Sequence, residues 1–245
     1  MPDPAAAGTA IPTAPYDDIA WRMVEGQHVV STMPLVDTLA EQAVLERLLD
    51  ATKPAIPEDC RDLHYLMSAP FRYGTYPAHS RFRRRGRSPG VFYASEHSLT
   101  AAAETVWYRL RFFEGSPGTP LPVAALAFTA IAVRAVTPFA ADLTAPPLSD
   151  RAGDWTDPDD YTACLAFADA ARDAGIEVIR YTSVRDPDAR PNLALLTCRA
   201  FAEREPLATE SWRIRLTPGR ALAVRDFPRL SVEFIRGDTR LARSS

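Results

Sequence analysis

The segment from Ser80 to Arg109 gathers three residue types whose chemistry fits one kind of ligand. It opens with a dense arginine run, continues through Tyr93 on a short apolar stretch, and reaches Glu104 eleven residues later. A guanidinium group can bind phosphate through two parallel hydrogen bonds, and an aromatic ring attracts a planar cation. A carboxylate stabilises positive charge that develops on a sugar when its bond to a leaving group breaks. The arginines of this run are Arg81, Arg83, Arg84, Arg85 and Arg87.

NAD carries all three features: a pyrophosphate, a planar cationic ring and a sugar bond to be broken. In this interpretation the arginines hold the pyrophosphate and Tyr93 stacks on the nicotinamide. Glu104 hydrogen-bonds the ribose hydroxyls and stabilises the oxocarbenium-like cation. Nicotinamide leaves as a neutral molecule, so no general acid is required. Arg81, Arg83, Arg85 and Arg87 would project from one face if the run is extended.

The arginine run has two competing interpretations. Phe82, Phe92 and Tyr93 lie nearby and could stack on bases, which would make the segment Arg81–Arg87 part of a nucleic-acid-binding module. The run could also be a solvated basic edge, because Lys53 is the only lysine among 28 basic residues and some arginines reflect coding bias. The net charge of −3 gives the protein no overall electrostatic attraction for nucleic acid, which disfavours direct binding.

The surrounding pattern predicts one α+β domain with a mixed or largely antiparallel β-sheet core and flanking helices. Residues 1–16 are rich in Ala and Pro and predict a disordered tail, followed by a single domain over 17–240. Helices are expected over 31–52, capped by Ser31 or Thr32 with Pro34 near its first position, and over 99–112, capped by Ser98. A third helix is expected over 157–175. Strands are expected over 62–70, 91–95, 128–136, 176–184, 192–198, 209–216, 221–225 and 229–234.

Several function classes are disfavoured by what the sequence lacks. There is no glycine-rich dinucleotide or P-loop motif, no GxSxG and no HExxH. Cys60, Cys164 and Cys198 are widely spaced, and the four histidines show no ligand spacing, so no metal is expected. The odd cysteine count and the lack of a signal peptide favour a reducing cytoplasm. No apolar run predicts a membrane span.

Four stretches make the chain similar to the RES-domain proteins, named for arginine, glutamate and serine residues. They are LHYLMSAPFRYGTYP (63–77), SRFRRRGRSPGVFYASEHSLTAAAET (80–105), DLTAPPL (142–148) and VIRYTSVRDP (178–187). The resemblance, to the longer proteobacterial branch, implies a fold related to diphtheria-type ADP-ribosyltransferases. It also implies a toxin that consumes NAD, paired with an Xre/DUF2384-type antitoxin that plugs the NAD site. The acceptor of ADP-ribose would be water, phosphate or a protein, such as phosphoribosyl pyrophosphate synthetase. A catalytically inactive antitoxin-binding protein is the further alternative.

The resemblance carries family roles onto residues of this chain. Tyr93, Glu104 and Ser183 match the family's tyrosine, glutamate and serine, and the arginine run matches its arginine-rich segment, with Arg81 and Arg83 expected at the pyrophosphate. The family's first arginine, which has a tyrosine beside it, has no clear counterpart. We prefer His64 with Tyr65 for this place. Two arginines compete with it, Arg22 in AWRMVEG and Arg72 in FRYG.

Overall fold

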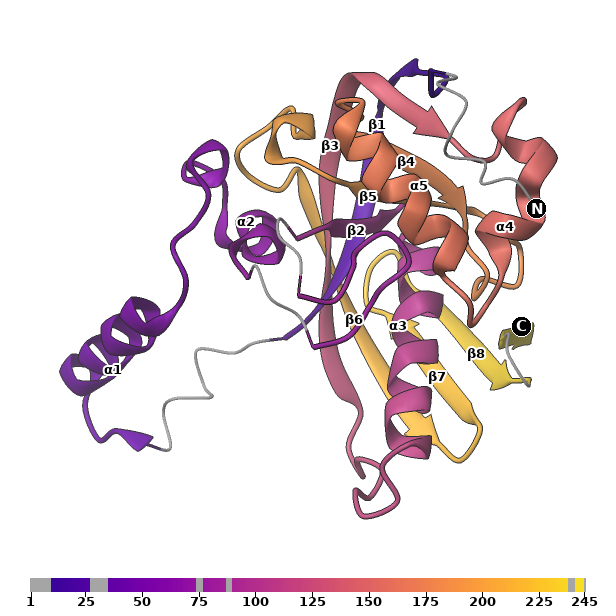
Figure 1. Ribbon diagram of the computed structural model, residues 1–245. Helices are drawn as coiled ribbons and strands as arrows, with labels where there is room; N and C mark the ends of the chain where they lie inside the picture. Colours follow the sequence, from indigo (N-terminus) through magenta and orange to yellow (C-terminus); the bar gives the residue numbers. More distant parts are fainter. Residues whose placement is uncertain (1–9, 27–34, 74–76, 87–89, 238–240, 245) are drawn as a thin grey trace.

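The computed structural model describes residues 10–26, 35–73, 77–86, 90–237 and 241–244, which form one nine-stranded sheet with helices around it (Figure 1). The strands are β1 (Ala14–Glu25), β2 (Phe92–Ser95), β3 (Leu126–Asp142), β4 (Val178–Thr182), β5 (Pro191–Leu195), β6 (Ala208–Thr217), β7 (Arg220–Arg225), β8 (Leu230–Arg236) and β9 (Leu241–Ser244). The helices are α1 (Leu39–Thr52), α2 (Tyr65–Arg72), α3 (Ser98–Glu114), α4 (Ala152–Thr156) and α5 (Thr162–Asp173), with short 3-10 turns at Glu58–Cys60, Leu148–Arg151 and Cys198–Ala200.

The sheet is mixed, and its strand order is β1-β2-β5-β4-β3-β6-β7-β8-β9. The β3–β4 pair is parallel, whereas the other ladders of the described strands are antiparallel. An additional β1–β3 pairing closes a ring of five strands, and β6 to β9 continue from β3 as a curved extension. The predicted α+β class with a mixed or antiparallel sheet is therefore confirmed.

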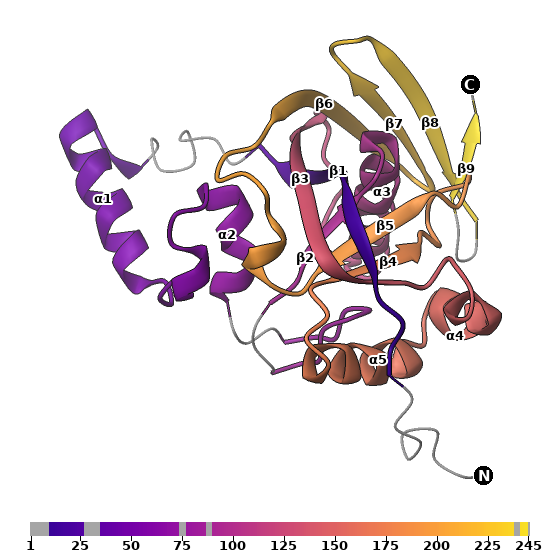
Figure 2. The ribbon, with the colours of Figure 1, turned by 90° about the horizontal axis from the view of Figure 1, so that it is seen from above.

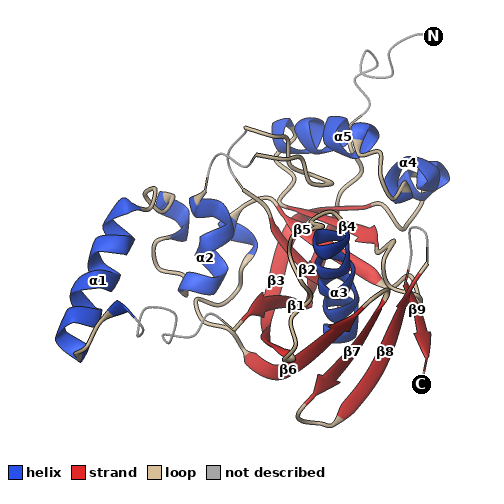
Figure 3. Ribbon diagram, turned by 90° about the horizontal axis from the view of Figure 1, so that it is seen from below, coloured by secondary structure: helices blue, strands red, loops and turns tan. Residues whose placement is uncertain are grey.

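Helix α3 lies in the concave side of this curved sheet (Figures 2 and 3). Its buried face is built largely from small residues, which let the helix approach the strands closely. Ala102, Ala103, Val106, Trp107 and Leu110 pack with Trp212, Ile214, Ala221, Ala223, Val232 and Phe234 of β6, β7 and β8. Burial of this face at helical spacing matches the helix predicted over 99–112. The structure begins the helix one residue before the predicted start, at Ser98, with no side-chain cap at His97.

The strand predicted over 62–70 is wrong, because this segment forms helix α2. The side chain of His64 accepts a hydrogen bond from the Leu66 backbone N–H and caps the helix. Met67, Pro70 and Phe71 are buried at helical spacing. Gly90 comes so close to the Pro70 carbonyl that a Cβ would lie 1.8 Å from its oxygen, which only glycine avoids.

Strand β1 was not predicted, and it begins at Ala14, inside the segment 1–16 predicted as a tail. Residues 1–9 lie outside the described residues, as do Ser31, Thr32 and Pro34 of the predicted helix 31–52. Within the described part of that prediction, α1 begins only at Leu39 and residues 35–38 lie outside it. Strand β1 pairs with β3 from Ala14 to Glu25. Its side chains are mostly exposed or half-buried, so it shows no clean alternation of apolar and polar residues.

Cys60 and Cys198 form a disulfide with their Cα atoms 5.5 Å apart, which differs from the reduced cysteines expected from the odd count. The bond ties the turn before α2 to the turn after β5, two segments 138 residues apart. No helix among the described residues is both long and apolar enough to cross a membrane.

Candidate active site

A cleft of about 580 Å³ lies between α3, strands β1 and β2, and the segment around Ser80. One row of the sheet forms part of its wall: Trp21 pairs with Ser95, Ser95 with Asn192, and Asn192 with Tyr181. The row crosses β1, β2, β5 and β4, so residues distant in sequence share one face. The remaining lining includes Arg22, Glu25, His79, Ser80, Arg81, Arg83, Tyr93, Glu104, Tyr108, Arg109, Phe112, Tyr161 and Arg185.

Glu104 lies on α3 and turns one carboxylate oxygen toward two donors. The Ser183 hydroxyl donates to Oε1 at 2.6 Å, and the Asn192 amide donates to the same oxygen at 2.7 Å. Ser183 and Asn192 are almost fully buried, whereas Glu104 is half-buried at the cleft. Among the described residues, the structure gives Oε2 no hydrogen bond. The arrangement anchors one oxygen and leaves the other for a ligand in the cleft.

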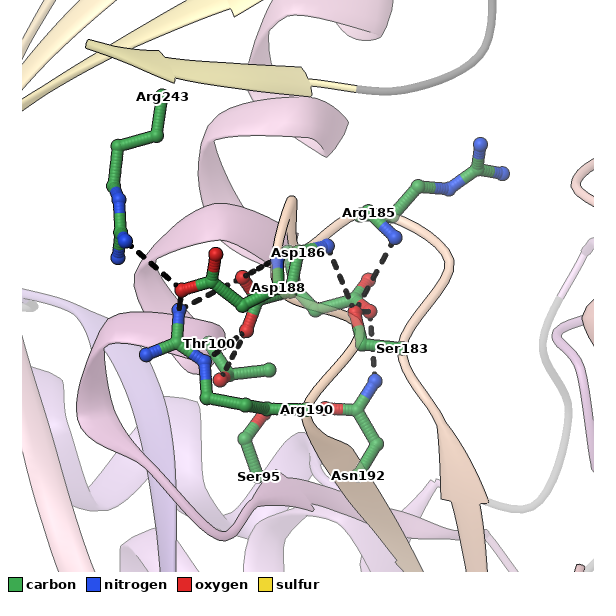
Figure 4. Close-up of polar contacts among 10 residues, drawn as sticks. Ser95, Thr100, Ser183, Arg185, Asp186, Asp188, Arg190, Asn192 and Arg243 are labelled. Carbon is green, nitrogen blue, oxygen red and sulfur yellow. Dashed lines mark hydrogen bonds and ion pairs between the residues drawn. The ribbon is translucent and has the colours of Figure 1, made fainter. Parts of the chain in front are cut away.

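Ser183 is held by a tight turn of the backbone. Its Oγ accepts hydrogen bonds from the backbone N–H groups of Arg185 at 3.3 Å and Asp186 at 3.0 Å, so its own proton is directed to Glu104. Asp186 lies between Thr100 and Arg190 and binds both (Figure 4). Burial acts to raise the pKa of Asp186, but hydrogen bonds from Arg190 and Thr100 outweigh it and hold the pKa below its usual value.

Tyr93 joins the arginine run to the cleft. Its hydroxyl lies 2.9 Å from the Ser80 hydroxyl and accepts a hydrogen bond from the Phe82 backbone N–H at 2.9 Å. Burial raises the pKa of the Tyr93 phenol, so the group stays neutral at pH 7. Tyr93 therefore fixes the segment from Ser80 to Phe82 while its side chain lines the cleft.

Arg22 lies in the cleft beside Tyr93. Its Nη1 donates to the Tyr93 carbonyl at 2.9 Å, and its guanidinium lies 5.0 Å from the centre of the Phe92 ring. Arg22 borders the cleft from β1, a strand far away in sequence, but it follows Trp21 directly, and its guanidinium lies against Phe92 on the opposite face of the sheet.

His64, Tyr65 and Arg72 do not line the cleft. His64 caps α2 and its ring lies 4.6 Å from that of Tyr65, which is 58% exposed. The Nε of Arg72 donates to the Pro54 carbonyl at 2.5 Å. His64, Tyr65 and Arg72 thus lie outside this cleft and Arg22 borders it, and which of them takes the place of the family's first arginine stays a prediction.

The arginine run does not present its guanidinium groups on one surface. Arg81 is buried and donates to the carbonyls of Trp155 at 2.7 Å and Asp157 at 2.9 Å, with its guanidinium 4.6 Å from the Tyr161 ring centre. Arg84 pairs with Asp169 at 2.6 Å. Arg81 and Arg83 line the cleft, Arg85 is exposed, and Arg87 lies outside the described residues.

Ser95, Tyr181, Arg185 and Asn192 are among the residues of the site that sequence reasoning missed. Burial raises the pKa of Tyr181 well above its usual value and lowers the pKa of Arg185, whose guanidinium stacks 3.4 Å from the Trp107 ring centre. The sequence does offer a signal for Asn192, because it is the one polar residue in the otherwise apolar run NLALL. Ser95 and Tyr181 required knowledge of the sheet register, and Arg185 lies in the loop between β4 and β5.

This fold and cleft define an α+β protein with a fixed glutamate, an arginine and a tyrosine around one ligand-sized space. The chain belongs to the RES-domain family, whose model matches residues 56–217. The chain is also similar to a chain in the crystal structure of the M. tuberculosis MbcT–MbcA toxin–antitoxin complex. That similarity amounts to 14% identity and a TM-score of 0.48 over 84% of this chain and 87% of the other. No curated protein matches the sequence.

Proposed function

We propose that the protein cleaves NAD at the nicotinamide–ribose bond and transfers the ADP-ribose moiety to an acceptor. The observation that carries this proposal is the Glu104 carboxylate, held at Oε1 by Ser183 and Asn192 at the wall of the cleft. A fixed negative charge beside a ligand-sized space suits a reaction in which positive charge develops on a sugar. Membership of the RES-domain family supports the same reaction.

In the proposed reaction the bond between the ribose C1′ and the nicotinamide nitrogen breaks, and its electron pair stays with the nitrogen. Nicotinamide departs as a neutral molecule and leaves an oxocarbenium-like ribosyl cation. The Glu104 carboxylate stabilises this cation and accepts hydrogen bonds from the ribose hydroxyls. The acceptor then bonds to C1′ and gives up its proton. Tyr93 and Arg22, at the same wall, bind and orient the dinucleotide.

We infer the biological setting from the family resemblance. The protein acts as the toxin of a type II toxin–antitoxin pair in the cytoplasm and is neutralised by an Xre/DUF2384-type antitoxin. The acceptor is a protein, with phosphoribosyl pyrophosphate synthetase as the first candidate, or else water or phosphate. The reaction requires no metal, because its leaving group is already neutral.

The test is to incubate the purified protein with NAD and to measure nicotinamide release by chromatography, with and without phosphate and candidate protein acceptors. Glu104→Gln should lower the rate by about 10²- to 10³-fold, the loss typical of one transition-state-stabilising group. Glu114→Gln, at the end of the same helix and 3.3 Å from Arg236, is the matched control and should keep the rate. Mass analysis of the product identifies the acceptor.

Absence of nicotinamide release under every condition would contradict the proposal. Calorimetry with NAD then separates two remaining cases. No binding of NAD by an intact fold would favour the inactive antitoxin-binding protein, whereas binding without turnover would make NAD a ligand that the protein does not cleave. Full activity of Glu104→Gln would remove Glu104 from its proposed role even if NAD is cleaved.

A further inference from the structure

Asn192 lies at a junction of three strands, in the wall of the cleft. It is 2% exposed, is the second residue of β5, and pairs with Ser95 of β2 on one side and Tyr181 of β4 on the other. Its backbone is therefore fixed by the sheet on both edges. A buried amide must satisfy both its donors and its acceptor, so its side-chain contacts define how it is oriented.

The hydroxyl of Ser95 sets that orientation. Ser95 is 3% exposed, and its Oγ donates to the Asn192 Oδ1 at 2.6 Å. With the carbonyl oxygen occupied by this donor, the NH₂ group faces Glu104 and donates to Oε1 at 2.7 Å. The reversed amide would place a carbonyl oxygen against the carboxylate, which is repulsive when Glu104 is ionised.

Two hydrogen-bond donors on Oε1 fix the orientation of the Glu104 carboxylate more tightly than one donor would. Ser183 reaches Oε1 from the turn after β4, and Asn192 reaches it from β5. Each donor is itself held by a second contact: the turn N–H groups bind the Ser183 Oγ, and Ser95 binds the Asn192 amide. Figure 4 shows Ser183 above Asn192, with Ser95 to the left of the Asn192 amide.

We propose that Asn192, oriented by Ser95, is a positioning residue that fixes the Glu104 carboxylate in place and aims its second oxygen at the ligand. This inference rests on the proposed function, because Glu104 is its reacting group. Asn192 acts through Glu104 and need not touch the substrate. Its removal should therefore lower kcat more than it changes KM.

Kinetics of three variants test the role. Asn192→Ala should lower kcat for nicotinamide release by about 10²-fold, the cost of a misplaced catalytic group, with KM for NAD changed less than about threefold. Ser95→Ala should cost about tenfold, because the amide keeps its donor but loses its orienting partner. Ser68→Ala is the matched control: Ser68 is equally buried, on α2, and outside the cleft lining. A wild-type kcat in Asn192→Ala would overturn the inference.

A second measurement, the NMR titration of Glu104, tests the contact with Asn192 without any need for catalysis. Asn192→Asp keeps the shape but places a like charge beside Glu104, which disfavours the ionised form of both groups. In protein carrying ¹³C-labelled glutamate, the Glu104 carboxyl signal is identified by its loss in Glu104→Gln. It should titrate at higher pH in Asn192→Asp than in the wild type, and the acid limb of the activity profile should move with it.

An unchanged titration in Asn192→Asp would overturn the inference whether or not NAD is the substrate. If the wild type releases no nicotinamide but the Glu104 signal shifts as expected, the proposed function fails and the positioning role stands. Both failures are thus distinguishable from one set of samples.

Discussion

The carboxylate of Asp186 accepts a 2.6 Å hydrogen bond from the hydroxyl of Thr100, which joins the loop after β4 to the first turn of α3. Arg190 binds the two oxygens of the same carboxylate at 2.7 and 2.8 Å. The Asp186 side chain is 0% exposed, and its backbone N–H also holds the Ser183 Oγ. One buried charge therefore connects the helix of Glu104 to the turn that supplies its serine donor.

Removing this charge should destabilise the fold as well as the site. Asp186→Asn leaves Arg190 without its buried charged partner and should lower the free energy of unfolding by about 3 kcal/mol. Urea denaturation measures the difference. Thr100→Val should cost about 1–2 kcal/mol by losing one hydrogen bond to a charged group. Thr105→Val, on the same helix but bonded to the Ala101 carbonyl, is its matched control and should cost less.

The contribution of Asp186 should depend on pH in a defined direction. Its pKa is lowered in the folded state, so the ionised group stabilises the fold above its unfolded pKa of about 3.9. That stability is lost as the pH falls through the lower, folded-state value. The difference in unfolding free energy between wild type and Asp186→Asn should be constant from pH 6 to 5 and shrink below about pH 4. A difference that grows on acidification would contradict the assigned pKa direction.

Arg81 should behave as a structural residue. Arg81→Ala removes donors to the carbonyls of Trp155 and Asp157 and should lower the free energy of unfolding by about 2 kcal/mol, because the buried Trp155 carbonyl loses its partner. Arg81→Lys should recover less than half of the loss, since an ammonium lacks the planar fork. Exposed Arg85→Ala should change stability by less than about 0.5 kcal/mol. Equal effects at both positions in thermal unfolding would refute the structural role.

The Cys60–Cys198 bond should stabilise the protein measurably. Its closed loop is long, with a sequence separation of 138, and the chain-entropy account gives up to about 4–5 kcal/mol for such loops. Dithiothreitol should lower the melting temperature of the wild type and leave a Cys60→Ala/Cys198→Ala variant unchanged. Reductant that shifts both proteins equally would point to Cys164 or to a nonspecific effect.

Local patterns predicted the elements that carry their own signal. The apolar-aromatic run of β2 and the small apolar residues of α3 appear at the expected places, so the Tyr93–Glu104 spacing has a correct local basis. The strand predicted over 62–70 was wrong because LHYLMSAP lacks the β-branched residues that favour a strand, while the His64 side chain caps a helix there. The polar, half-exposed residues of β1 offered no periodicity to detect.

Long-range pairing accounts for what sequence reasoning missed at the site. Ser183 contacts Glu104 across 79 residues, and only the family resemblance linked the two. The choice among His64, Arg22 and Arg72 depended on β1 lying against β2 and β3, which no local pattern reports. For the same reason Arg81 was expected at the pyrophosphate, although its side chain binds the carbonyls of Trp155 and Asp157.

The row Trp21–Ser95–Asn192–Tyr181 makes the cleft sensitive to the length of its strands as well as to their residue types. Successive side chains of a strand point to opposite faces, so inserting or deleting one residue in β5 would turn Asn192 away from Ser95 and Glu104. Such a variant would contain every residue of the site, but the side chains would no longer lie together. Tolerance to insertions is therefore expected at the β6–β7 and β7–β8 turns, and not within β2 or β5.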